Sequence, residues 1–167
     1  MNPAKQITYT IFLLGSLLLT TAHKAIALPD DKEQPINVSA DKARKNSNQG
    51  LTIYQGNVVI TQGSIRVTGD EVAVYDDNGA VSKMIAKGAA AEFRQRPEPE
   101  SSETIANGST IEYDIKKETL LLLDNAKLEQ GGDITTSNMI TYDMKSTVVN
   151  AGDENGRVIM TLQPATQ

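Results

Sequence analysis

Apolar and polar side chains alternate along much of the chain after residue 35, as at Ile111, Tyr113 and Ile115, which are separated by acidic residues. A period of two is that of a β-strand with one face buried and the other in water. Turn-forming residues recur at intervals of eight to twelve residues, and Asn78-Gly79 is a strong short signal for a hairpin. The pattern therefore predicts an all-β domain of about 14–16 short strands, built as a sandwich, a barrel or a jelly roll.

A ten-residue unit occurs three times without gaps and closes each time on Tyr-Asp. A degenerate copy begins at Val38 (VSADKARKN), and the four starting positions lie 29, 38 and 29 residues apart. The longer middle interval contains residues 96–103, a polar, proline-rich stretch that predicts an exposed loop. Such spacing indicates true internal repetition. The three full copies are residues 67–76 (VTGDEVAVYD), 105–114 (IANGSTIEYD) and 134–143 (ITTSNMITYD).

A second unit lies between these copies. Residues 54–63 (YQGNVVITQG) and 123–131 (LDNAKLEQG) share a turn residue, then Asn, then alternation, and both end in Gln-Gly. Residues 85–96 (IAKGAAAEFRQR) are a looser version. The chain is thus a series of paired strand units, and chance similarity among β-rich segments is a poor explanation of their strict order.

Alternation also assigns side chains to one apolar face, which is mostly small or β-branched. The whole chain has two phenylalanines and no tryptophan, although large aromatics commonly fill β cores. Either the aliphatic side chains pack into a complete core, or the two walls leave an apolar channel between them. The run from Leu120 to Leu123 cannot all face one interior, so its outer side is covered by a loop or forms an interface. We place on the apolar face Ile36, Val38, Leu51, Ile53, Val58, Ile60, Ile65, Val67, Ala73, Tyr75, Ile111, Tyr113, Ile115, Ile140 and Tyr142.

The N-terminus has the three parts of a secretory signal peptide: Lys5, the apolar residues 11–19 (IFLLGSLLL), and an A-x-A cleavage site at residues 25–27. A nine-residue helix is too short to cross a hydrocarbon core of about 30 Å, so an uncleaved anchor is the weaker interpretation. We expect residues 1–27 to be removed and residues 28–167 to form a single domain. Cleavage removes two lysines and no acidic residue, so the formal charge changes from −5 to −7. An acidic surface argues against binding nucleic acid or anionic lipid headgroups.

The sequence offers no catalytic chemistry. The chain has no cysteine, and its one histidine, His23, lies in the predicted signal peptide, so the usual thiol nucleophile and general base are missing. Ser39 and Lys42 have the spacing of a Ser-x-x-Lys motif but lie in a repeat copy. The pairs Asp30-Asp31, Asp76-Asp77 and Asp153-Glu154 stand in turn signals, where aspartate bonds the local backbone. We expect no enzyme activity, no metal and no cofactor.

The chain resembles the LptA/OstA-like family of periplasmic lipopolysaccharide-transport proteins. The residues that carry the resemblance are 34–38 (QPINV) leading into Ala40-Asp41, then 56–63 (GNVVITQG), the Tyr-Asp strand ends, and 157–164 (RVIMTLQP). It covers essentially the whole mature chain, and the GNVVITQG block is its most specific part. The resemblance implies an open, V-shaped β jelly roll whose hydrophobic groove holds the acyl chains of lipid A.

The resemblance also implies a non-enzymatic carrier that passes lipopolysaccharide from the inner to the outer membrane through protomers joined head to tail. An LptC-like inner-membrane component would bind the N-terminal edge (Ile36, Asn37, Val38, Ser39, Ala40), and an LptD-like outer-membrane component the C-terminal edge (Val158, Ile159, Met160, Thr161, Leu162). The groove would be lined by Ile36, Val38, Ile60, Ile65, Val67, Phe93, Ile111, Tyr113 and Tyr142.

The sequence leaves two alternative functions open. The membrane-anchored LptC and the N-terminal domain of LptD have a similar fold, although the A-x-A site and the length of the chain favour the soluble bridge. The other alternative is a secreted structural or carbohydrate-binding β-repeat module with a filled interior and no lipid.

Overall fold

The structure is a computed structural model that describes residues 31–96, 98, 100–154 and 156–164, so the predicted signal peptide lies outside the described residues. The described chain forms one antiparallel sheet of ten strands, with two short 3-10 turns, η1 (Asp31–Glu33) and η2 (Ser47–Gln49). No helix in this part of the chain is long and apolar enough to cross a membrane. The strands are β1 (Asn37–Ser39), β2 (Lys42–Asn46), β3 (Leu51–Gln62), β4 (Ile65–Asp77), β5 (Ala80–Gln95), β6 (Thr104–Asp114), β7 (Thr119–Gln130), β8 (Asp133–Asp143), β9 (Val148–Ala151) and β10 (Ile159–Thr161).

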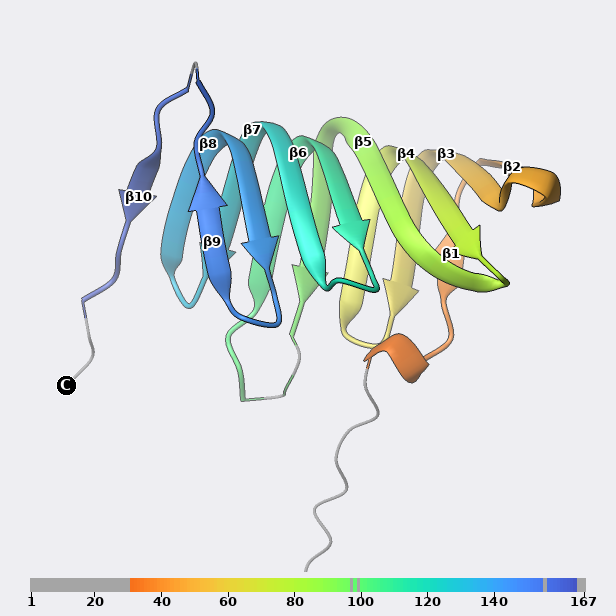
Figure 1. Cartoon of the computed structure of the whole chain (residues 1–167), viewed down its shortest axis with the longest axis horizontal. Coiled ribbons are helices and arrows are strands. Elements are labelled where there is room, and N and C mark those ends of the chain that lie inside the picture. Colours follow the sequence, from red (N-terminus) through yellow and green to blue (C-terminus); the bar gives the residue numbers. More distant parts are fainter. Residues whose placement is uncertain (1–30, 97, 99, 155, 165–167) are drawn as a thin grey trace, which may run out of the picture.

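The six long strands, β3 to β8, each run through two walls. The pairing of neighbouring long strands shifts register once near the middle, for example between Gln55 and Val58 of β3 and between Lys87 and Ala91 of β5. Figure 1 shows these strands arching over the top of the molecule, so that each strand lies partly in one wall and partly in the other. If each long strand is counted as two segments, the sheet contains sixteen strand segments including the four short strands. This number lies within the 14–16 that the sequence predicts. The fold is the open β jelly roll.

We call the two walls A and B. Wall A contains residues 58–62 of β3 and the half-strands in line with them, flanked by β1 at one end and β10 at the other. Wall B contains residues 51–55 of β3 and the half-strands in line with them, flanked by β2 and β9. Each end of the molecule therefore presents two edge strands, one from each wall.

The turn residues of the second repeat make the corner between the walls. In β3 the corner is formed by Gly56 and Asn57, with φ of 78° and 45°, and in β7 by Asp124 and Asn125, both with φ of 58°. A side chain at position 56 would place its Cβ 2.2 Å from Oδ2 of Asp41, so this position requires glycine. The Gly-Asn of the GNVVITQG block is thus a bend inside a continuous strand.

The inner faces of the walls are built from three cross-strand rows of mostly apolar side chains. A complete row crosses all the strands of its wall, because alternation is kept within each half-strand. One row on wall A consists of Val38, Ile60, Val67, Phe93, Ala106, Leu128, Thr135 and Met160. The two rows on wall B are Ala43, Tyr54, Val72, Ala86, Ile111, Leu122, Ile140 and Ala151, and Lys45, Thr52, Val74, Met84, Tyr113, Leu120, Tyr142 and Val149.

Four residues that alternation places on the apolar face lie on the outer face of wall B instead. Val72 and Val74 are buried on the inner side, so their neighbours Ala73 and Tyr75 point outward, and Leu51 and Ile53 pair with these two across the strands. In β4 the reason is the corner between Thr68 and Glu71, where the register shift changes which alternate residues face inward. In β3 the even-numbered residues face inward on both sides of the corner, as at Tyr54 and Val58, so the apolar odd-numbered residues Leu51 and Ile53 face outward.

The four leucines of β7 divide between the two faces as strand geometry requires. Leu120 and Leu122 are fully buried on the inner face, and Leu121 and Leu123 lie half-buried on the outer face of wall B. Within the strand register, Leu121 pairs with Glu112 and Leu123 with Thr110. On the other side Leu121 pairs with Thr141 and Leu123 with Met139, so the outer leucines lie on the surface among mostly polar neighbours.

Candidate functional site

The inner faces of the two walls meet along the centre of the molecule. Phe93 on wall A is completely buried, and its ring packs edge-on against that of Tyr113 on wall B, with ring centroids 5.1 Å apart. The surrounding aliphatic side chains, such as Ile60 and Leu122, are equally buried. Of the two possibilities for the interior, the packed core describes this structure, and the space between the walls widens at their open edge.

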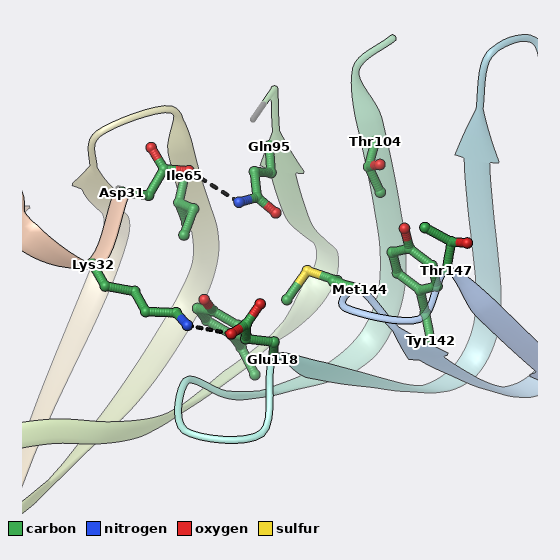
Figure 2. Close-up of a pocket in the computed structure, with 10 residues that line it drawn as sticks. Asp31, Lys32, Ile65, Gln95, Thr104, Glu118, Tyr142, Met144 and Thr147 are labelled. Carbon is green, nitrogen blue, oxygen red and sulfur yellow. Dashed lines mark hydrogen bonds and ion pairs between the residues drawn. The ribbon is translucent and has the colours of Figure 1, made fainter. Parts of the chain in front are cut away.

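At that open edge lies a cavity of about 190 Å³, which we call the mouth cavity. Wall A contributes Gln95 and Thr104, and wall B contributes Tyr142 together with Met144 from the following turn. Figure 2 shows the Tyr142 hydroxyl pointing toward the wall that carries Thr104. The full lining is Asp31, Lys32, Ile65, Gln95, Thr104, Tyr113, Glu118, Tyr142, Met144 and Thr147.

Wall A changes from apolar to polar at the mouth. Gln95, Thr104 and Gln130 form a cross-strand row on β5, β6 and β7, two residues beyond the apolar row that contains Phe93. The side-chain amide of Gln130 donates to Oγ1 of Thr104 at 3.3 Å and to the hydroxyl of Tyr142 on wall B at 2.7 Å. The groove is therefore amphipathic, with an apolar interior and neutral hydrogen-bonding groups at its edge.

The segment around η1 lies across the mouth at its N-terminal end. The carboxylate of Asp31 accepts hydrogen bonds from the backbone N–H and the hydroxyl of Ser64 at 2.5 and 2.7 Å, and from Nε2 of Gln95 at 2.9 Å. These contacts fasten η1 to wall A. The ammonium of Lys32 forms an ion pair with Glu118, which lies in the turn between β6 and β7 on wall B (Figure 2). One short segment thus joins the two walls.

The outer face of wall A is charged and exposed to solvent. The guanidinium of Arg94 bonds the carboxylate of Glu92 at 2.6 Å and approaches Glu103 at 3.4 Å. The hydrogen bond from Arg94 is the main cause that keeps the pKa of Glu92 below its ordinary value. These charges are thus paired with one another.

The predicted groove residues lie on the inner side of the molecule, and their contact with lipid stays a prediction. Ile65, Tyr113 and Tyr142 line the mouth cavity, whereas Phe93 lies deeper, in the contact between the walls. Ile60, Val67 and Ile111 are buried in the same core, while Ile36 packs against it from the N-terminal end, where Val38 is 37% exposed.

The predicted edge strands are at the two ends of the sheet. Asn37–Ser39 of the N-terminal edge form β1, which pairs only with β3 in the described part of the chain. Ile159–Thr161 of the C-terminal edge form β10, which pairs only with β8 there. The side chains of Ile159 and Met160 are 64% and 56% exposed, which is unusual for large apolar residues in a monomeric protein.

Sequence reasoning missed the polar row at the mouth and the segment that crosses it. Strands β3, β5 and β7 end in a glutamine, namely Gln62, Gln95 and Gln130. This repeated glutamine is visible in the sequence as part of the second repeat. The ion pair between Lys32 and Glu118 joins residues 86 apart and had no local signal. In the described residues no group of three or more His, Cys, Asp or Glu side chains could hold a metal ion.

Comparison with known proteins identifies the family. Residues 37–148 match the family described as LptA/(LptD N-terminal domain) LPS transport protein. The lipopolysaccharide export system protein LptH of Pseudomonas aeruginosa is 39% identical over 141 residues, which cover 84% of this chain and 81% of that protein. The lipopolysaccharide export system protein LptA of Haemophilus influenzae is 30% identical over 165 residues, 96% of this chain and 95% of that protein.

A solved structure agrees with these matches. The crystal structure of LptH from Pseudomonas aeruginosa, described as the periplasmic component of the lipopolysaccharide transport device that is homologous to LptA, superposes with a TM-score of 0.76 at 36% identity. The match covers 81% of this chain and 100% of that one. The chain therefore belongs to the LptA family of lipopolysaccharide transport proteins, a family of periplasmic carriers and not of enzymes.

Proposed function

We propose that this protein binds the acyl chains of lipopolysaccharide between walls A and B and passes the lipid from the inner toward the outer membrane. The observation that carries the proposal is the mostly apolar row on wall A, which extends from Val38 at one end to Met160 at the other with Thr135 as its one polar member. Both terminal side chains are exposed, so the apolar surface continues to the two ends of the molecule. An apolar surface that reaches both ends suits passage of a lipid better than storage.

The energetic basis is the hydrophobic effect. Each methylene taken out of water contributes about 0.8 kcal/mol to the free energy of binding. Several acyl chains can therefore be bound by a long apolar surface, without any catalytic group. Wall B offers such a surface opposite wall A, with Ile111, Leu122 and Ile140 in one row. Binding and release of the lipid then require only that the acyl chains can reach and leave this apolar surface.

Acyl chains must separate the walls to reach that surface. The mouth cavity measures about 190 Å³, whereas pockets that bury a small organic ligand commonly measure about 300–1,000 Å³. In this structure the walls thus lie too close together for acyl chains to fit between them. Lipid would replace contacts between the walls, such as that of Phe93 with Tyr113, by contacts of each wall with acyl chains.

A photoreactive residue tests the site. Placed at Tyr113 on the inner face, it should crosslink to lipopolysaccharide in cells, while at Thr61 on the outer face of wall A it should not. Lys145 is a poorer outer control, since it follows Met144 of the mouth cavity. Equal labelling at Tyr113 and Thr61 would count against a groove between the walls. Labelling at neither would favour the alternative of a structural β-repeat module with a permanently filled interior.

The bridge would be formed by strand addition at both ends of the sheet. All strand pairs are antiparallel, so β10 of one copy and β1 of the next run in opposite directions when the sheet is continued by translation. The same holds for β9 and β2 on wall B. We propose that copies join in this way, with an LptC-like component at the N-terminal edge and an LptD-like component at the C-terminal edge.

Maturation is the remaining part of the proposal. We propose that residues 1–27 are removed on export, since the A-x-A site at residues 25–27 is separated from the apolar run by five residues. Protein recovered from the periplasm should begin at Leu28, which mass spectrometry of the intact chain measures. Intact Met1 in the membrane fraction would contradict this cleavage.

A further inference from the structure

We propose that the mouth row recognises the neutral hydrogen-bonding groups at which acyl chains join their sugar, namely amide, ester and hydroxyl groups, and not the phosphates of the lipid. We define the mouth row as Gln95, Thr104 and Gln130 of wall A together with the hydroxyl of Tyr142 on wall B. The inference rests on the proposed function, because it assigns part of the lipid to one part of the same groove.

The mouth row and the apolar row lie at different depths in the groove. Phe93 and Gln95 are two residues apart on β5 and share a face, so their side chains stand about 7 Å apart along the strand. Phe93 belongs to the apolar row and Gln95 to the mouth row. A lipid whose acyl chain lies against Phe93 therefore brings the polar end of that chain to the level of the mouth row.

The mouth row leaves hydrogen-bonding capacity open toward the cavity. Nε2 of Gln95 donates to Asp31, so its carbonyl oxygen is directed away from Asp31 and can accept from a hydroxyl or an amide N–H (Figure 2). The hydroxyls of Tyr142 and Thr104 both accept from Gln130, so their own hydrogens can be donated to an ester or amide carbonyl. The row thus offers both donors and acceptors, all of them neutral.

The charge of the mouth cavity disfavours a phosphate. The ionisable groups of the mouth cavity other than its tyrosines are Asp31, Lys32 and Glu118, which are two carboxylates and one ammonium. The ammonium is already paired with Glu118. A phosphate placed there would meet a net negative charge, because the one ammonium is already paired with a carboxylate, and this disfavours its binding. The basic strand β2, with Lys42, Arg44 and Lys45, lies at the edge of wall B and does not line the cavity.

Binding of three probes to protein purified from the periplasm tests the inference. The probes are lipid A with both phosphates, the same lipid A with both phosphates removed, and a fluorescent alkyl probe of equal chain length that has no sugar, amide or ester. We expect the two forms of lipid A to bind wild type within about threefold of each other. In Tyr142→Phe and Thr104→Val, each of which removes one neutral hydrogen bond, both forms should bind about five- to tenfold more weakly. The alkyl probe should bind unchanged.

The matched control is Thr61→Val, which makes the same side-chain change as Thr104→Val on the outer face of wall A and should alter no affinity. A loss above about tenfold when the phosphates are removed would overturn the inference, since that is what recognition of a charged group predicts. If Tyr142→Phe weakened binding of the alkyl probe as much as binding of lipid A, the inference would also be overturned, because a structural effect lowers the affinity for all probes alike. If wild type binds none of the three probes, the proposed function fails, and this inference fails with it.

Discussion

Joining the two walls covalently at the mouth should abolish lipopolysaccharide binding, with a loss of affinity of more than about a hundredfold, because the locked protein cannot reach its binding-competent state. The change is the double variant Lys32→Cys/Glu118→Cys, whose two thiols replace an ion pair that already joins the walls. The chain contains no cysteine, so a short cleavable thiol-to-thiol reagent would react only at these two positions. Fluorescence titration with labelled lipopolysaccharide measures the loss, and cleavage of the reagent should restore binding.

The control is a pair of cysteines within one wall. Thr61 and Arg66 are register partners on the outer face of wall A, so Thr61→Cys/Arg66→Cys can be joined by the same reagent without holding the walls together. This protein should bind lipopolysaccharide like wild type. Full binding by the protein locked between Lys32 and Glu118 would contradict entry of the lipid between the walls.

Removing the natural ion pair alone should have a small effect, which is why the covalent lock is the informative experiment. The side chains of Lys32 and Glu118 are each about one-third exposed, at 34% and 33%. Surface ion pairs contribute about 0–1 kcal/mol, so Lys32→Ala is expected to change affinity by less than about fivefold. The ion pair therefore holds the walls only weakly, as a carrier that must open requires.

Local pattern was enough to predict the strands and their turns. Period-two alternation depends on neighbours within one strand, and hairpin signals such as Asn78-Gly79 depend on neighbours within one turn. The structure has Asn78-Gly79 between β4 and β5, and the proline-rich residues 96–103 between β5 and β6. The repeated units are also real elements, since the Tyr-Asp unit falls on β4, β6 and β8.

The direction of a side chain beyond a corner could not be predicted, because it depends on how many residues the corner takes. The gap-free alignment of the repeats equates Tyr75 with Tyr113, yet Tyr113 points inward and Tyr75 outward. The corner of β4 falls between Thr68 and Glu71, and that of β6 between Asn107 and Thr110, so corresponding positions differ by 39 residues and not by 38. Val74 is therefore the structural counterpart of Tyr113.

Contacts between the walls were equally outside the reach of sequence. The edge-on contact of Phe93 with Tyr113 and the hydrogen bond from Gln130 to Tyr142 join side chains from different strands and different walls. Neither pair has a local signature, since any inward residue of one wall can meet any inward residue of the other. The apolar face could thus be named in advance, whereas the closure of the groove and its polar mouth could not.

Assembly should depend on β10 more strongly than on any other exposed strand. Met160 continues the apolar row of wall A beyond Thr135, and in a head-to-tail contact it would come next to Val38 of the following copy. Burial of such a side chain contributes about 1.5–3 kcal/mol, so Met160→Glu should raise the dissociation constant of self-association by about tenfold or more. Sedimentation velocity over a range of protein concentrations measures this change.

A second variant at the same position separates backbone pairing from side-chain burial. Met160→Pro removes one backbone donor and fixes φ, so β10 can no longer form a regular ladder with a neighbouring strand. It should shift the population to monomer at least as far as Met160→Glu does. The interior strands β3 to β8 do not depend on β10 for their own pairing, so the far-ultraviolet circular dichroism spectrum and the thermal midpoint should stay close to those of wild type.

The matched control is Ile159→Glu, which puts the same charge on the same strand. Ile159 pairs with Thr136 and lies on the outer face, where a charge meets water in the assembled and the separate protein alike. Self-association should therefore be weakened much less than in Met160→Glu. Equal weakening by the two glutamates would show that the inner row has no special part in assembly. If wild type stays monomeric at hundreds of micromolar, strand addition between copies is wrong. The contact is heterologous, with different surfaces on the two sides, so it must continue from copy to copy into a rod whose grooves are joined end to end.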